Sequence, residues 1–305
     1  MDRLTTYFFQ ARTVSSGDRQ VGIETESLLV TPGTGLPITQ DVSQAIFSLL
    51  ANDFGWDVEE VKGGKKVRLR KGGFALYYEL GWNNFELVTP VYDFNDTAIW
   101  ADNQNYLGEI SRAGEQCGAV LTDLSWAGSS SNTLIMPDKR DEIWLELDGQ
   151  ALYGLGHIAS IHFNIDLVSV EEGMRFISRL MPLFEKQGWP PQSNSGVWNG
   201  YLRESRAKYQ EGRYGPPPTD FCKYCSRLAS YAVVMNSING RLEIAKPRLP
   251  FANCSNPNID MFLRSVWWWM RLRVRGGKLV LEIRDVPRTI PTKESFDMIR
   301  NCLDI

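Results

Sequence analysis

Two carboxylates spaced two residues apart in an apolar segment are the first feature that could carry chemistry. Residues 19–31 read as a strand, in which Glu24 and Glu26 share one face while Ile23 and Thr25 share the other. On a face that otherwise reads as buried, two such carboxylates repel each other and lose hydration. A cation between them would relieve both penalties, so the pair indicates a metal site.

Further segments repeat this arrangement of polar groups on one face of an extended chain. The groups are His162 in residues 161–167, Glu282 and Arg284 in residues 278–286, and Glu79 and Glu86 in residues 79–90. Taken singly, each is explained by solvent exposure or by a structural hydrogen bond. Independent surface decoration explains poorly why four apolar strands all carry such groups, so we expect them to converge on one site.

The types of these groups limit the chemistry. Carboxylate oxygens with one imidazole suit Mg²⁺ or Mn²⁺ better than structural zinc, which recruits thiolates. A magnesium site that faces an arginine stabilises charge on a transferring phosphoryl group. The sequence contains neither a G-x-x-x-x-G-K-[ST] loop nor a G-x-G-x-x-G after a strand, which excludes P-loop and Rossmann sites. We therefore predict that metal ions hold the phosphates of ATP.

These short motifs, in this order, resemble those of the glutamate-cysteine ligase family and of the wider carboxylate-amine ligases with a glutamine-synthetase-like catalytic sheet. The matching segments are G-I-E-T-E at 22–26, E-L-G and F-E-L-V-T-P within 79–90, S-I-H-F-N-I at 160–165, and L-E-I-R at 281–284. Residues 193–198, 205–206 and 215–217 are similar to the loop that follows the central helix of that family. The resemblance touches most of the chain between residues 20 and 286.

The resemblance implies a set of site residues and an activity. The implied metal ligands are Glu24, Glu26, Glu79, Glu86, His162 and Glu282. Arg284 would contact the γ-phosphate or an acyl-phosphate, and Arg206 the substrate or a phosphate. The implied reaction joins a carboxylic acid, such as the γ-carboxyl of glutamate or another amino acid, to an amine at the expense of ATP. Thr25 and the short chain depart from the family pattern, which leaves both substrates open.

Three other functions could use the same residues. Guanidino kinases use a related catalytic sheet, so a phosphotransferase would stop at a phosphorylated product. A nucleotide-binding protein would bind ATP without chemistry, and a metal-dependent hydrolase would act without ATP. Detection of an amide product, or of substrate-dependent ADP release, separates the ligase from these alternatives.

The periodicity predicts an α+β fold with a mostly antiparallel sheet, helices packed on one side, and a single catalytic domain over residues 1–305. The predicted strands are 19–31, 66–70, 74–80, 85–90, 119–124, 144–147, 159–167 and 278–286. The predicted helices are 41–50 with Asp41 as N-cap, 95–113, 170–186, 259–274 and 295–302. Residues 192–219, rich in Ser, Asn, Gly, Arg and Pro, read as a long loop that could close over the site.

Two basic runs have two interpretations. They comprise Lys65, Lys66, Arg68, Arg70 and Lys71, and then Arg271, Arg273, Arg275 and Lys278. Either they are a solvated strand edge and a helix end, or they contact the phosphates of a nucleotide. On the second interpretation Arg68 and Arg70 join Arg284 as predicted nucleotide-binding residues.

The bulk composition narrows the class of protein. With 305 residues, 43% of them hydrophobic, the chain can bury a large core, and a net charge of -3 gives no broad attraction to nucleic acid or anionic lipid. We see no secretory signal, and Arg264, Arg271 and Arg273 interrupt the most apolar segment, which argues against a membrane span. Five cysteines fit reduced thiols in the cytoplasm, with zinc or redox chemistry at Cys222 and Cys225 as the weaker alternative. The predicted partners are small molecules, and both a monomer and a homo-oligomer are compatible with the sequence.

Overall fold

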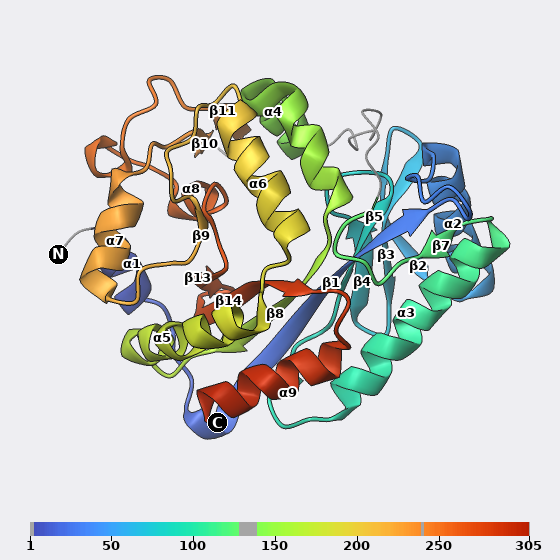
Figure 1. The fold of residues 1–305 in the computed structure, drawn as a ribbon, viewed down its shortest axis with the longest axis horizontal. Helices are drawn as coiled ribbons and strands as arrows, with labels where there is room; N and C mark the ends of the chain where they lie inside the picture. The colour runs from blue at the N-terminus through green and yellow to red at the C-terminus, as the bar shows by residue number, and fades with distance from the viewer. Residues whose placement is uncertain (1–2, 128–138, 239–240, 305) are drawn as a thin grey trace.

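A strongly curved antiparallel sheet is the centre of the computed structural model, which describes residues 3–127, 139–238 and 241–304 (Figure 1). Within these residues the sheet has ten strands, and the order along it is β13-β14-β8-β1-β5-β4-β3-β2, with β6 and β7 also pairing with β1. The strands are β1 (Gln20–Val30), β2 (Asp57–Lys62), β3 (Lys65–Lys71), β4 (Phe74–Tyr78), β5 (Asn84–Val88), β6 (Tyr92–Asp93), β7 (Val120–Leu121), β8 (Ser160–Asp166), β13 (Met270–Arg275) and β14 (Lys278–Pro287). Neighbouring strands of this sheet are antiparallel.

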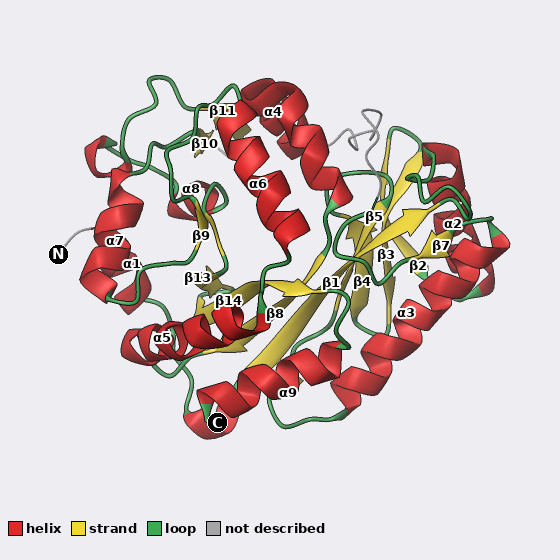
Figure 2. Ribbon diagram, in the orientation of Figure 1, coloured by secondary structure: helices red, strands yellow, loops and turns green. Residues whose placement is uncertain are grey.

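Four helices cover the apolar face of the sheet: α2 (Gln40–Asp53), α3 (Ala98–Gln116), α5 (Val170–Gln187) and α9 (Thr292–Leu303) (Figure 2). Each strand presents alternate residues to this face, so Ile161, Phe163 and Ile165 of β8 are all fully buried. They belong to one core with apolar residues of α5 and α9, while α2 and α3 form a second core with β3, β4 and β5. The prediction of an α+β fold with a large antiparallel sheet is confirmed.

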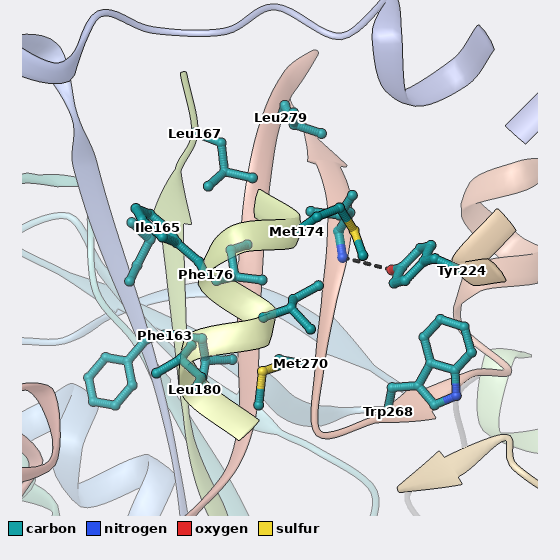
Figure 3. Packing of buried hydrophobic residues seen from close by; sticks show 14 of the residues in the cluster. Phe163, Ile165, Leu167, Met174, Phe176, Leu180, Tyr224, Trp268, Met270 and Leu279 are labelled. Carbon is teal, nitrogen blue, oxygen red and sulfur yellow. Dashed lines mark hydrogen bonds between the residues drawn. The ribbon is translucent and has the colours of Figure 1, made fainter. Parts of the chain in front are cut away.

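The edge strand β13 is fixed by a side chain rather than by a further strand. The amide of Leu272 donates a hydrogen bond of 2.9 Å to the hydroxyl of Tyr224, which lies on α7 (Phe221–Ser230) (Figure 3). Tyr224 is fully buried beside Trp268, with the two rings edge to face at 4.8 Å. This contact satisfies a buried backbone donor that a missing neighbour strand would otherwise leave unpaired.

The opposite, polar face of the sheet is covered by segments from the middle of the chain. Helices α4 (Lys139–Asp148) and α6 (Gln192–Glu204) lie over it in Figure 1, with the 3₁₀ segment η2 (Gly149–His157) between them in sequence. The short strands β9 (Tyr214–Gly215) and β12 (Trp267–Trp268) pair in parallel there. The helices are therefore not confined to one side of the sheet.

The remaining elements lie outside the main sheet. They are α1 (Arg3–Phe9), η1 (Ser16–Asp18), the hairpin β10 (Met235–Ile238) and β11 (Arg241–Ile244), η3 (Phe251–Asn253) and α8 (Ile259–Leu263). None of the described helices is long and apolar enough to cross a bilayer. All five cysteines belong to the described residues, and all are free thiols.

The predicted helix at 259–274 is wrong beyond its first turn. Helix α8 ends at Leu263, and the chain then enters β12 and β13. Met270 and Leu272 are fully buried in the core with α5, while Arg271, Arg273 and Arg275 point to the other face. The alternation M-R-L-R-V-R has the period of a strand, and it outweighs the helix propensity of its residues.

Three local predictions are also wrong. Residues 144–147 belong to α4, because Ile143, Trp144 and Leu147 have the spacing of one helical face and pack into one apolar cluster. Residues 192–204 form α6 rather than a loop, since Trp198 and Tyr201 bury a helical face. The N-cap of α2 is Thr39, whose hydroxyl accepts from the amide of Val42 at 3.4 Å, and Asp41 lies in the first turn.

Candidate active site

Strand register brings the predicted polar groups together on one face of the sheet. Glu24 of β1 lies directly opposite His162 of β8, and Glu26 lies opposite Glu86 of β5. On the next strand, Glu282 of β14 lies opposite Asn164 of β8. Because directly opposed residues share a face, four neighbouring strands build one polar surface from distant parts of the sequence.

This surface is the floor of a cavity of about 300 Å³. The predicted residues that line it are Glu24, Glu26, Glu79, Glu86, His162, Glu282 and Arg284. A volume of this size lies at the lower end of the range of small-molecule sites. The seven residues therefore form one concave site rather than a set of solvated surface groups.

His162 links the two carboxylates of β1. Its Nδ1 atom lies 3.2 Å from Oε2 of Glu24, and its Nε2 atom lies 3.6 Å from Oε1 of Glu26. Ser160 donates from its amide to Glu26 at 2.8 Å, and Asn164 donates to Glu24 at 3.1 Å. Burial opposes the charged imidazole, but Glu26 and Glu24 together raise the pKa of His162 above its ordinary value. The two acids thus favour the protonated form of His162, in which the imidazole would partly neutralise both.

The charged form of Glu86 is strongly disfavoured unless a cation or a proton binds to it. Glu86 is 5% exposed, and burial, followed by the negative charges of Glu79 and Glu24, raises its pKa well above the ordinary value. The hydroxyl of Tyr77 donates to Oε1 of Glu86 at 2.9 Å. Burial likewise raises the pKa of Glu26. This end of the floor is an acid-rich pocket with a deficit of positive charge.

The other end of the floor is rich in arginine. Glu282 is completely buried and forms ion pairs with Arg275 at 2.8 Å and Arg284 at 3.5 Å, and Nε of Arg271 also contacts it. Burial opposes ionisation of Glu282, but the surrounding guanidinium groups, Arg271 first and then Arg273, hold its pKa well below the ordinary value. Glu282 is therefore a charged carboxylate embedded among cations.

A β-bulge in β14 directs two charged residues into the cavity. The register between β14 and β8 shifts between Ile283 and Val286, and Asp285 has a φ of 57° within the shift. Both Arg284 and Asp285 line the cavity. A non-glycine residue in the left-handed region is retained only where its surroundings fix it, and such strain concentrates at functional sites. Burial raises the pKa of Asp285.

An aromatic wall faces the charged floor. Its residues come from α4, α6, β9 and β12, and they are Trp144, Trp198, Tyr201, Tyr214 and Trp267. Trp198 stacks on Tyr214 with ring centroids 5.3 Å apart, and it packs against Trp267 at 5.2 Å. The hydroxyl of Tyr201 donates to Asp148 at 2.5 Å, which anchors α6 against the end of α4. The wall therefore presents an apolar surface, and a buried hydrogen bond fixes the helix that carries it.

The acid-rich end suits a hard divalent cation by its chemistry. Three side chains there carry carboxylate oxygens, Glu26, Glu79 and Glu86, and burial, together with the charge of Glu79, raises the pKa of Glu26 and of Glu86. Within the described residues, however, no group of three or more His, Cys, Asp or Glu side chains is already arranged as a metal cage. The carboxylates instead bond to His162, Ser160 and Tyr77, so cation binding would exchange these partners.

Three predicted residues lie apart from this cavity. Arg206 is exposed and packs against Gly149, where a Cβ atom would meet its Nε atom at 2.5 Å. Arg68 and Arg70 lie on β3, and both pair with Glu59, at 2.8 and 2.9 Å respectively. None of the three arginines is among the residues that line the cavity.

Sequence reasoning missed most of the wall and part of the floor. Arg271, Arg273 and Arg275 were placed on a predicted helix, with contact to nucleotide phosphates as the second interpretation of the run. The alternation of arginine with apolar residues in 270–275 carried the signal of a strand. Tyr77 precedes the E-L-G motif by two residues and shares its face. The wall residues Trp198 and Tyr214 belong to the predicted loop, and no local pattern points them toward the acids.

Comparison with known proteins gives structural similarities at low identity. Neither a protein-family model nor a curated protein matches the sequence. The structure is similar to glutamate-cysteine ligase from Francisella tularensis in complex with AMP, with a TM-score of 0.47 and 12% identity over 96% of this chain and 68% of that chain. Apo GmaS without ligand is similar with a TM-score of 0.28 and 13% identity, over 54% of this chain and 37% of that chain.

Proposed function

We propose that this chain is an ATP-dependent carboxylate-amine ligase. One observation carries the proposal: register on four adjacent antiparallel strands gathers Glu24, Glu26, Glu86, His162 and Glu282 on the floor of one cavity, beside Arg284. Burying this many charged groups is costly unless ligands use them. The segregation of acids toward β5 and of arginines toward β13 suits a cation and an anionic phosphate side by side.

The proposed reaction has two steps. The carboxylate of the first substrate attacks the γ-phosphate of ATP, which forms an acyl-phosphate and releases ADP. The amine of the second substrate then attacks the acyl carbon, loses a proton, and expels inorganic phosphate to leave an amide. Phosphorylation of the substrate itself provides activation, so no nucleophilic serine or cysteine is required.

The residues of the floor have distinct roles in this scheme. Glu24, Glu26, Glu79 and Glu86 are the proposed holders of Mg²⁺ or Mn²⁺. His162 would join them only as a neutral imidazole, and Glu282 only by exchanging its arginine partners for the ion. Such an ion, when bound, neutralises charge on the phosphates and orients them. Arg284 places a guanidinium group beside the transferring phosphoryl group, where negative charge develops. Arg68, Arg70 and Arg206 would take part only through a change of conformation, since they lie outside the cavity.

The aromatic wall has a role that follows from the chemistry of the intermediate. An acyl-phosphate is lost to hydrolysis if water reaches it before the amine does. Trp144, Trp198 and Trp267 are each less than 9% exposed and face the charged floor. They would exclude water from the acyl carbon, a role expected of the segment 192–219, to which Trp198 alone of the three belongs.

The test is a screen for ADP release with pairs of amino acids and small amines, in the presence of Mg²⁺ or Mn²⁺, followed by detection of the amide by mass spectrometry. Glu24→Gln should reduce turnover by more than the roughly 10- to 100-fold cost of losing an outer-shell partner of a metal. Glu171→Gln, on the exposed face of α5, is the matched control. Wild-type rates in Glu24→Gln would contradict the site, and a stable phosphorylated acceptor in place of an amide would favour a phosphotransferase.

A further inference from the structure

Arg273 is a buried guanidinium group that forms no ion pair or hydrogen bond within the described part of the chain, although the charge of Glu282 lies near it. It is 4% exposed and lines the cavity, and its Nε atom is buried with no hydrogen-bond partner. The side chain makes no ion pair with any acid of the described residues. An unpaired buried charge is strongly unfavourable, so a group that is retained in this state normally serves a ligand.

The surrounding acids cannot supply the missing partner. Glu282, the nearest acid of the floor in the register of β13 and β14, already accepts hydrogen bonds from Arg271 and Arg275 and pairs with Arg284. Asp260, on α8, accepts a short hydrogen bond from the hydroxyl of Tyr7. The arginine end of the floor therefore keeps an excess of positive charge around Arg273.

Elsewhere in the chain a buried arginine is satisfied in full. Arg213 is completely buried, and its guanidinium group donates to the carbonyl oxygens of Ser265 and Ala232, to the hydroxyl of Ser265, and to Gln210. Those partners are backbone and neutral groups that fix a loop, which is a structural use of arginine. Arg273 has no such set and faces open space in the cavity instead.

We infer that Arg273 is an anion-binding residue of the cavity in addition to Arg284, and that it takes an oxyanion of a bound ligand, either a phosphate of the nucleotide or a carboxylate of a substrate. A planar guanidinium group matches both oxyanions with two parallel hydrogen bonds. The choice between these two sources rests on the proposed function, whereas the anion site itself rests only on the cavity and on the unpaired charge. The site can therefore be tested by binding, without any turnover.

Three variants separate a ligand-binding role from a structural one. Arg273→Met removes the charge and keeps much of the volume. Arg273→Lys keeps the charge but loses the planar guanidinium group that can make two parallel hydrogen bonds. Arg203→Met, the control, removes an arginine that is 74% exposed on α6. Titration calorimetry with sodium tripolyphosphate probes the phosphate source, and titration with succinate and L-glutamate probes the carboxylate source. We expect Arg273→Met to weaken one class of probe by about 10- to 100-fold, as for a lost charge-assisted hydrogen bond, with Arg273→Lys between it and the wild type.

The results assign the source or refute the site. If Arg273→Met loses affinity for tripolyphosphate alone, the ligand of Arg273 is a phosphate of the nucleotide. If it loses affinity for succinate and L-glutamate alone, the ligand is a carboxylate of a substrate. In the absence of ligand, Arg273→Met should melt at the wild-type temperature or above, because an unpaired buried charge has been removed. A wild-type chain that binds neither class of probe, a Met variant that binds both as tightly as the wild type, or a lowered melting temperature with unchanged binding would overturn the inference. Failure of the ADP-release screen alone would refute the ligase and leave this site standing.

Discussion

Two glutamates on the same floor should respond in opposite ways to the same substitution. Glu282 is fully buried among arginines and is held in its charged form, whereas Glu86 lies among other acids and favours its neutral form. Glutamine has nearly the size of glutamic acid but carries no charge. Glu282→Gln therefore removes a charge that the fold requires, and Glu86→Gln removes one that the fold resists.

The expected magnitudes differ by several kcal/mol. Glu282→Gln leaves the buried guanidinium group of Arg271 without its carboxylate, and breaking a buried pair in this way costs about 3 to 5 kcal/mol. Glu86→Gln keeps an oxygen that can accept from Tyr77, so its free energy of unfolding should stay within about 1 kcal/mol of the wild type.

The two effects should also depend on pH with opposite signs. The raised pKa of Glu86 means that its contribution to stability is complete below the unfolded-state value, near 4.5, and is lost as the pH rises through the folded-state value. The wild type should therefore lose stability relative to Glu86→Gln above about pH 4.5. The lowered pKa of Glu282 gives stability that is present above this pH and is lost on acidification, so the deficit of Glu282→Gln should shrink at low pH.

Urea denaturation from about pH 2.5 to pH 8, followed by tryptophan fluorescence without added metal, measures both effects, because the Glu282 contribution changes only below about pH 4.5. The midpoint and the slope give the free energy of unfolding, and an unchanged slope shows that the extent of unfolding is the same. Glu171→Gln on the exposed face of α5 is the control for removal of a surface charge. Equal destabilisation by the two floor substitutions, or a deficit of Glu282→Gln that grows on acidification, would refute the electrostatic reasoning.

Three further outcomes follow from the same structure. Arg284→Ala should lower kcat for ADP release more than it weakens ATP binding, since its partner charge develops during phosphoryl transfer, and equal losses in both would indicate simple binding. Tyr224→Phe should destabilise the chain by about 1 to 3 kcal/mol in urea, because the buried amide of Leu272 loses its acceptor, whereas an unchanged midpoint would mean that this amide finds another partner. Arg70→Met should leave ADP release unchanged, because Arg70 pairs with Glu59 outside the cavity, and a tenfold fall would place it at the nucleotide.

The sequence by itself determined the strands that carry the floor and the side chains that point into it. Alternation in β1, β8 and β14 follows from the period of two of an extended chain, which depends on local backbone geometry alone. The same rule separates His162 from Phe163 and Glu282 from Ile283, so the predicted polar face matches the one observed.

Only the tertiary structure decided which strands are neighbours, what covers the floor, and which arginines reach it. Strand order and register depend on contacts between distant segments, as when Glu24 meets His162, and no local pattern specifies those pairings. Residues 270–275 form a strand because Met270 and Leu272 are buried against α5, and that packing brought Arg273 into the cavity. The aromatic wall arises in the same way, since burial of a helical face at 192–204 fixed where Trp198 would point.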